Sequence, residues 1–232
     1  MRDYHPPTDP YLEIIYQDTS LLVLDKPSGL LSVPGRDPLH RDSLASRAEA
    51  RFPGAMTVHR LDMDTSGLVV MARNAVAHRQ LSRLFQDRKV SKVYYAKVWG
   101  ELADAEGEID LPLICDWPNR PRQKVDFEVG KPSLTRWQRV ATGENCSLVK
   151  LMPVTGRSHQ LRVHLQAIGH PILGDPFYAH APALAAAPRL LLHAAALSFA
   201  HPDSGEALRF VSVADAELFA LGDASSSFTF VL

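Results

Sequence analysis

The chain has 232 residues, 46% of them hydrophobic, which is enough for one sizeable domain or two small ones with a real core. The formal net charge of -1 excludes a uniformly basic, histone-like nucleic-acid binder, but not a protein whose basic residues gather on one face. The two cysteines cannot form a disulfide framework or a zinc site of their own, and they are expected to be small buried hydrophobic side chains in a reducing compartment. Since the sequence shows neither a signal-peptide core nor an apolar run of membrane-spanning length, we expect a soluble cytoplasmic protein.

The N-terminal part of the chain begins with three prolines in residues 1–10, which predict an extended arm. Two β-prone segments follow, residues 11–17 and 21–24, joined by a turn. Prolines and glycines in residues 26–35 then predict a rigid irregular loop. A helix is expected over residues 42–52, with Asp42 or Ser43 as its N-cap.

Asp62 lies in the most informative stretch of the sequence, residues 59–71. A turn cluster at residues 64–67 follows it, and then the short apolar run 68–71, which predicts a buried strand. Asp62 is therefore expected at the rim of a sheet, where functional carboxylates are often presented. On spacing alone, a turn or cap role for this aspartate is the stronger interpretation.

The rest of the chain is predicted to be rich in strands. Residues 75–88 form an amphipathic helix whose arginines are expected to be solvated, and residues 158–168 form another helix that ends at Gly169. The loop 115–124 combines basic residues with Trp117, a composition that fits RNA contact and a packed tryptophan equally well. The expected strands span residues 92–99, 108–114, 131–140, 147–152, 190–199 and 207–213, and a short helix is expected over 214–221.

Strands outnumber helices and often follow one another directly, which predicts an α+β fold with a central, mainly antiparallel mixed sheet flanked by helices and loops. The sequence contains no repeat and no linker rich in glycine and serine. We therefore expect one catalytic domain over residues 11–221, preceded by the arm 1–10 and followed by a tail at 222–232.

Several motifs of the sequence resemble the RluA family of pseudouridine synthases. His59-Arg60-Leu61-Asp62-x-x-Thr65-Ser66-Gly67 resembles the family's signature, and Lys26-Pro27-x-Gly29-Leu30 resembles a stretch that braces its active site. Further matches are Lys92-x-Tyr94-x-Ala96, Gly156-Arg157-Ser158-His159-Gln160-Leu161-Arg162, His170-Pro171-Ile172-Leu173-Gly174-Asp175 and Leu191-Leu192-His193-Ala194. The resemblance extends from about residue 11 to about residue 202 and implies a pseudouridine synthase catalytic domain.

This resemblance implies a role for each of four residues. Asp62 is the catalytic carboxylate, acting as nucleophile or base, and Arg162 is its guanidinium partner. Tyr94 stacks on the uracil, and Arg60 fills the space that the flipped base leaves in the RNA stack. Besides the turn or cap role of Asp62, the other three residues each have a structural alternative: a surface helical arginine for Arg162, a core strand residue for Tyr94 and a simple phosphate contact for Arg60.

The resemblance also implies the substrates. The loop 111–121 is most similar to the family member that modifies uridine 746 of 23S rRNA and uridine 32 of a tRNA anticodon stem-loop. No cofactor is expected, because the reaction only moves the glycosidic bond from N1 to C5 of the uracil. No metal is expected either, since His159 and His164 are five residues apart on one helix and no cysteine or acidic partner completes a site. We expect a monomer that binds RNA and no membrane.

Two rival functions stay open at this point. The first is an RNA-binding or RNA-folding protein of the same fold without turnover. The second is a hydrolase of small molecules with an aspartate nucleophile, which would need a metal or a second carboxylate, and Asp64 is the candidate nearest to Asp62.

Overall fold

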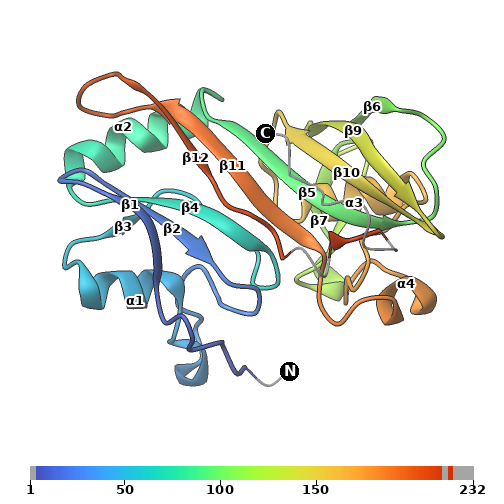
Figure 1. The fold of residues 1–232 in the computed structure, drawn as a ribbon, viewed down its shortest axis with the longest axis horizontal. Helices are drawn as coiled ribbons and strands as arrows, with labels where there is room; N and C mark the ends of the chain where they lie inside the picture. Colours follow the sequence, from blue (N-terminus) through green and yellow to red (C-terminus); the bar gives the residue numbers. More distant parts are fainter. Residues whose placement is uncertain (1–3, 216–218, 222–232) are drawn as a thin grey trace. The chain divides into compact units, whose positions relative to one another are not determined.

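The computed structural model describes residues 4–215 and 219–221 and divides into two compact units (Figure 1). Unit 1 comprises Met1–Lys92 and Ala194–Ser212, and unit 2 comprises Val93–His193 and Val213–Leu232. Each unit is built on β-strands that pair antiparallel, among them β1 with β2, β2 with β4, β5 with β10 and β9 with β10. The predicted α+β class, with few helices and a mainly antiparallel sheet, is confirmed. None of the helices formed by the described residues is long and apolar enough to cross a membrane.

The sheet of unit 1 has the order β1-β2-β4-β11-β12, with the short strand β3 paired to β4. The sequence offered Asp42 or Ser43 as the N-cap of α1, and the structure shows Ser43, whose hydroxyl accepts the amide of Ser46 at 3.1 Å. Asn74 caps α2 with its side-chain oxygen in the same way. The elements of this unit are β1 (Glu13–Gln17), β2 (Leu21–Lys26), η1 (Pro38–His40), α1 (Leu44–Arg51), β3 (Met56–Thr57), β4 (Ser66–Ala72), α2 (Ala75–Gln86), β11 (Leu192–Ala200, in unit 1 from Ala194) and β12 (Ala207–Val211).

Strand β4 is the centre of unit 1, because all seven of its residues are buried. Leu68, Val70 and Ala72 alternate along it and pack with Ala77 and Leu81 of α2. The apolar run that predicted a buried strand is thus the core strand itself. It begins at Ser66, so the prediction that Ser66 and Gly67 belong to the turn is wrong.

Gly67 is required at its position by the approach of β11. A Cβ at this residue would lie 2.3 Å from the carbonyl oxygen of Ala194, and the φ angle of 110° also disfavours a side chain. The glycine of the signature therefore allows β11 to pack against β4, directly after the loop that carries Asp62.

The N-terminal arm, of which residues 4–10 are described, follows an irregular path that is anchored to unit 1. The Tyr4 hydroxyl donates to the carbonyl of Asp42 at 2.8 Å and accepts the amide of Leu31 at 3.0 Å. The ring of Tyr11, the first residue after the arm, lies with its centroid 4.4 Å from the guanidinium carbon of Arg47. Residues 1–3 lie outside the described part of the chain.

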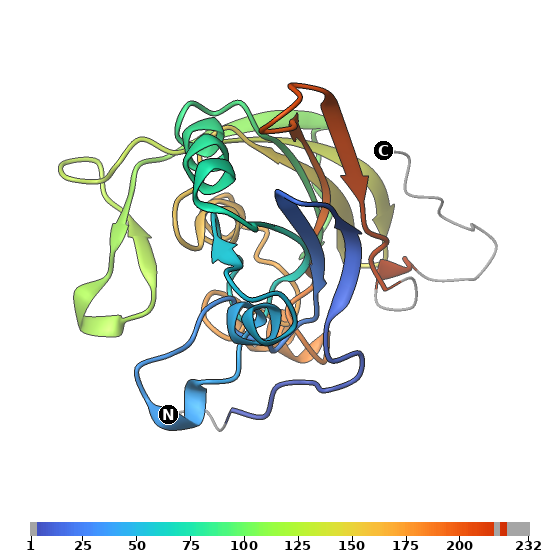
Figure 2. The ribbon, with the colours of Figure 1, turned by 90° about the vertical axis from the view of Figure 1, so that its left-hand side faces the viewer.

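The sheet of unit 2 has the order β5-β10-β9-β6, and a separate two-stranded hairpin, β7-β8, projects from it (Figure 2). Trp117 lies in the loop of this hairpin with 66% of its surface exposed, so it is not the packed tryptophan of the alternative interpretation. The elements are β5 (Ser91–Trp99, in unit 2 from Val93), β6 (Glu106–Asp110), β7 (Leu113–Cys115), η2 (Trp117–Asn119), β8 (Gln123–Val125), β9 (Leu134–Gly143), β10 (Cys146–Pro153), α3 (Gln160–Ala167) and α4 (Ala181–Ala185).

Some predicted elements differ from the structure. The single strand expected over residues 108–114 is two strands, since Leu111-Pro112 separates β6 from β7 and a proline cannot donate to a ladder. The strands β3 and β8 were not predicted, because two or three residues carry too little periodicity. The expected helix over 214–221 and the tail 222–232 include residues 216–218 and 222–232, which lie outside the described residues.

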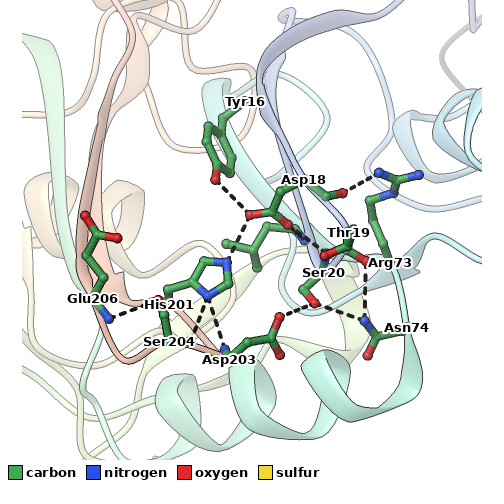
Figure 3. Close-up of polar contacts among 11 residues, drawn as sticks. Tyr16, Asp18, Thr19, Ser20, Arg73, Asn74, His201, Asp203, Ser204 and Glu206 are labelled. Atoms are coloured by element: carbon green, nitrogen blue, oxygen red, sulfur yellow. Dashed lines mark hydrogen bonds and ion pairs between the residues drawn. The ribbon is translucent and has the colours of Figure 1, made fainter.

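A polar cluster in unit 1 ties the β1–β2 turn to the β11–β12 turn (Figure 3). Oδ1 of Asp18 accepts the amides of Ser20 and Leu21 at 2.7 Å, and Oδ2 accepts the Tyr16 hydroxyl at 2.8 Å. His201 accepts two backbone amides of its own turn at Nδ1, so its proton is on Nε2, which donates to Asp18 Oδ2 at 2.9 Å.

These contacts decide the ionisation of Asp18. Partial burial would raise its pKa, but the amides of Ser20 and Leu21, and then His201 and Tyr16, outweigh the burial and lower the pKa from 3.8 to about 2. A carboxylate whose pKa is lower in the folded state than in the unfolded state stabilises the fold at pH values above its unfolded pKa. This contribution is lost as the pH falls toward the folded pKa.

The first prediction concerns this carboxylate. Asp18→Asn should lower the free energy of unfolding at pH 7 by about 1–2 kcal/mol, because the amide replaces a charged acceptor of four hydrogen bonds. The gap between wild type and variant should narrow as the pH falls from about 4 to about 2. Urea unfolding of both proteins between about pH 2 and pH 7 measures this difference in stability. A difference that does not depend on pH would contradict the lowered pKa of Asp18.

Candidate active site

Asp62 lies half-buried in the loop between β3 and β4, and hydrogen bonds fix the backbone on both of its sides. On the N-terminal side, the Ser32 hydroxyl donates to the carbonyl of Leu61 at 2.7 Å and accepts the amide of Leu61 at 3.0 Å. The amide of Thr65 closes the turn by donating to the carbonyl of Asp62 at 3.2 Å. These hydrogen bonds fix the backbone position from which the Asp62 side chain projects.

Lys26 fixes the C-terminal side of the same loop from inside the protein. Its side chain is fully buried, and its ammonium donates to the carbonyls of Pro27 at 2.9 Å, Leu30 at 2.7 Å and Met63 at 2.9 Å. An ammonium has three hydrogens to donate, and each of these carbonyls takes one. Gly29 also donates its amide to Met63 at 2.9 Å. The loop 26–35, which was expected to brace the site, therefore holds the residues on either side of Asp62.

His59 anchors the start of the signature to the core of unit 1. Its Nε2 accepts the amide of Val70 at 3.0 Å, and its ring stacks on that of Phe85 with centroids 4.5 Å apart. Burial, and then the positive charge of Lys92, lower the pKa of His59 to about 3. The imidazole is thus neutral at physiological pH, as an acceptor of a backbone amide must be. Arg60, the next residue, is exposed.

Arg162 is one of the largest fully buried side chains in the described part of unit 2, so the alternative of a surface helical arginine is wrong. Its Nε donates to Oδ2 of Asp175 at 2.8 Å and one terminal nitrogen donates to Oδ1 at 2.6 Å, a bidentate ion pair. The rings of Phe177 and Tyr178 each lie with their centroids 5.2 Å from the guanidinium carbon. The arginine is held in one orientation by these groups.

Asp175 is a residue that sequence reasoning matched to a family stretch without giving it a role. It is fully buried, and Oδ1 also accepts the amides of Phe177 at 2.8 Å and Tyr178 at 3.2 Å. The preceding Gly174 has a φ angle of 70°, and a Cβ there would lie 1.9 Å from the carbonyl oxygen of Arg189. The only signal in the sequence was an acidic residue next to a glycine in a turn-rich loop, and thirteen residues separate it from Arg162.

Tyr178 and His159 form a second unpredicted pair in unit 2. The Tyr178 hydroxyl accepts the amide of Gln123 at 2.8 Å and is hydrogen-bonded to Nδ1 of His159, 2.6 Å away. His159 is the N-cap of α3 and has a left-handed φ angle of 53°. The pair connects the start of the helix that carries Arg162 to the β8 hairpin.

Tyr94 lies on β5 and is half-buried, whereas its neighbour Tyr95 is buried. Because side chains alternate along a strand, the two tyrosines point to opposite faces of the sheet, and Tyr95 is the one in the core. The structure thus places Arg60 and Asp62 in one loop of unit 1, and Tyr94 and Arg162 in unit 2. Among the described residues, no group of three or more His, Cys, Asp or Glu could hold a metal ion.

The comparisons with known proteins agree on one family. Residues 20–167 match the model of the RNA pseudouridylate synthases. The chain belongs to this family. It is 54% identical over 216 residues to the dual-specificity RNA pseudouridine synthase RluA of Escherichia coli K12, covering 93% of this chain and 99% of that protein. It is 57% identical over 209 residues to the protein of the same name from Vibrio vulnificus, covering 88% and 84%.

Solved structures of the family have the same fold. Human RNA pseudouridylate synthase domain containing 1 aligns with a TM-score of 0.76 at 31% identity and covers 92% of this chain and 89% of its own. Human RNA pseudouridylate synthase domain containing 4 aligns with a TM-score of 0.71 at 26% identity, covering 89% and 90%. The predicted family and enzyme class are confirmed: the protein is an RNA pseudouridine synthase, an isomerase.

The second prediction concerns the buried pair of unit 2. Asp175→Asn should lower the free energy of unfolding by about 3–5 kcal/mol, because it removes the charged partner of a bidentate contact that is buried on both sides. The matched control is Glu108→Gln, which breaks the exposed ion pair with Arg136 and should cost less than about 1 kcal/mol. Urea unfolding measures both, and equal costs would show that the pair at Arg162 is no more important than a surface one.

Proposed function

We propose that Asp62 is the catalytic carboxylate of this pseudouridine synthase, acting on the sugar or base of the target uridine. The observation that supports the proposal best is the backbone around Asp62, held by Ser32 on one side and by Lys26 and Gly29 on the other. A group that attacks one atom of a bound nucleotide gains from such fixed placement. The signature to which Asp62 belongs resembles the family's catalytic motif residue by residue.

Three further residues are proposed to bind the substrate. Arg162 is proposed as the guanidinium partner of Asp62 by resemblance to the family, and its fixed bidentate contact with Asp175 suits a role that needs one orientation. Tyr94 stacks its ring on the detached uracil. Arg60 enters the RNA stack when the target uridine is flipped out, and its exposed side chain leaves it accessible to RNA.

The proposed substrates are stem-loops of 23S rRNA and of tRNA. The relatives from Escherichia coli and Vibrio vulnificus carry the name dual-specificity RNA pseudouridine synthase, and the loop 111–121 resembles the same member of the family. In that loop the guanidinium of Arg120 lies 4.6 Å from the ring centroid of the exposed Trp117, an arrangement that suits RNA bases and phosphates. We further propose a cytoplasmic monomer whose catalytic domain spans residues 11–221.

The third prediction tests Asp62. Asp62→Asn should reduce pseudouridine formation by at least about a hundredfold while RNA binding persists, because the carboxamide can neither attack nor accept a proton. Wild type and variant are incubated with unmodified tRNA and 23S rRNA transcripts, and pseudouridine is mapped by carbodiimide-induced reverse-transcription stops.

The matched control is Asp64→Asn, which removes a carboxylate from the same turn and should leave most of the activity. Substantial turnover by Asp62→Asn would refute the role of Asp62. Stops in one transcript only would narrow the substrate, and no stops with wild type, together with tight RNA binding, would favour an RNA-binding protein without turnover.

A further inference from the structure

The residue that follows the C-cap of α2 is an arginine in a conformation that favours glycine. The amide of Lys89 donates to the carbonyl of Leu84 at 2.8 Å and the amide of Arg88 donates to that of Phe85 at 3.2 Å, which is the Schellman motif. Arg88, with a φ angle of 58°, occupies the left-handed position of this motif. A side chain there crowds the backbone, so the arginine is kept at a cost in strain. Its side chain is exposed, so packing does not explain its presence.

The same segment is strongly basic, although the whole chain has a formal net charge of -1. Residues 79–92 contain five arginines and lysines against a single acidic residue, Asp87, which lies 3.7 Å from Arg83. In the part of the chain that the structure describes, no carboxylate lies within ion-pair distance of Arg88, Lys89 or Lys92. Lys92 is half-buried, and this burial lowers its pKa because nothing compensates the charge.

The basic turn adjoins the loop of Asp62 within unit 1. Phe85, whose carbonyl accepts the amide of Arg88, stacks its ring on His59 with centroids 4.5 Å apart. His59 precedes Arg60 directly and Asp62 by three residues. Figure 1 shows the chain turning directly from the end of α2 into β5. Groups that bind RNA in this turn would therefore contact nucleotides next to the one at Asp62.

We propose that the α2–β5 turn, defined as residues 87–92, binds backbone phosphates of the substrate RNA through Arg88, Lys89 and Lys92. The inference rests on the proposed function only for the identity of the RNA. A polyanion is the ligand that relieves three uncompensated positive charges, and phosphate contacts position a nucleic acid without reading its sequence. The alternative is that Arg88 and Lys89 only complement the negative end of the α2 dipole, a role that affects stability and not RNA binding.

The fourth prediction separates these roles with Arg88→Gly. Glycine relieves the left-handed strain, so the melting temperature should stay unchanged or rise by up to about 4 °C. The Kd for a labelled, unmodified stem-loop RNA with the sequence of a tRNA anticodon arm should rise about fivefold at low salt. The slope of log Kd against log salt between about 50 and 200 mM should fall by about 0.7–0.9. Fluorescence anisotropy measures both quantities.

Two variants serve as controls. Asn145→Gly relieves a left-handed residue in the β9–β10 turn, at a φ angle of 52°, without removing a charge. Arg209→Gln removes an exposed charge of β12 and lies on the face of the sheet opposite that of Leu208 and Phe210, which pack against the core that α2 covers. Neither should change the Kd or the salt slope.

An unchanged Kd and salt slope for Arg88→Gly would overturn the proposal, as would a fall in melting temperature with no effect on binding. Conversion of the same RNA by wild-type protein is followed in parallel as tritium release from uridine labelled at C5. If wild type releases no tritium but Arg88→Gly still weakens binding, the proposed function fails and the phosphate contact stands. If tritium is released and binding is unaffected by the variant, only the phosphate contact fails.

Discussion

The ammonium of Lys26, buried among three carbonyl oxygens, is the interaction on which the candidate site depends. A buried positive charge is tolerated only when its hydrogens are all taken up, and here the carbonyls of Pro27, Leu30 and Met63 accept them. That requirement forces the loop after β2 to curl around the ammonium and ties it to the loop that carries Asp62. The prolines and glycines of residues 27–35 make this irregular path possible, and Ser32 adds a second connection at Leu61.

In unit 2 the buried charge is negative, and hydrogen-bond donors surround it in place of acceptors. The carboxylate of Asp175 is fully buried, and the fork of Arg162 together with the amides of Phe177 and Tyr178 satisfies its oxygens. Both units thus fix their functional segments with buried charges whose partners are mostly backbone groups. Such networks are costly to disturb, which holds each side chain in one arrangement. Arg60 and the α2–β5 turn are the groups that we propose contact RNA.

The sequence predicted well those parts in which an apolar run, a periodic pattern or a capping residue carries the information. Strand β4, helix α2, the paired strands β9 and β10 and the end of α3 at Gly169 were found because burial and capping leave a local signature. The motif around Asp62 came from resemblance, because spacing alone favoured a turn residue. The sequence could not predict that Lys26 and Arg162 are buried, because lysine and arginine are mostly exposed unless the folded chain supplies partners for their charge. The ion pair of Arg162 with Asp175 joins residues thirteen apart, which no local pattern reports.

The hypothesis to test is that the backbone brace sets the position of the Asp62 carboxylate for catalysis. Its most direct test is the single-turnover rate of pseudouridine formation by Ser32→Ala, with enzyme in excess over a tRNA transcript and with circular dichroism confirming the fold. Removal of the hydroxyl frees the amide and carbonyl of Leu61, so the rate constant should fall about tenfold or more while the Kd for RNA stays the same. A wild-type rate constant in a folded Ser32→Ala protein would show that the contacts of Ser32 with Leu61 do not set the position of Asp62.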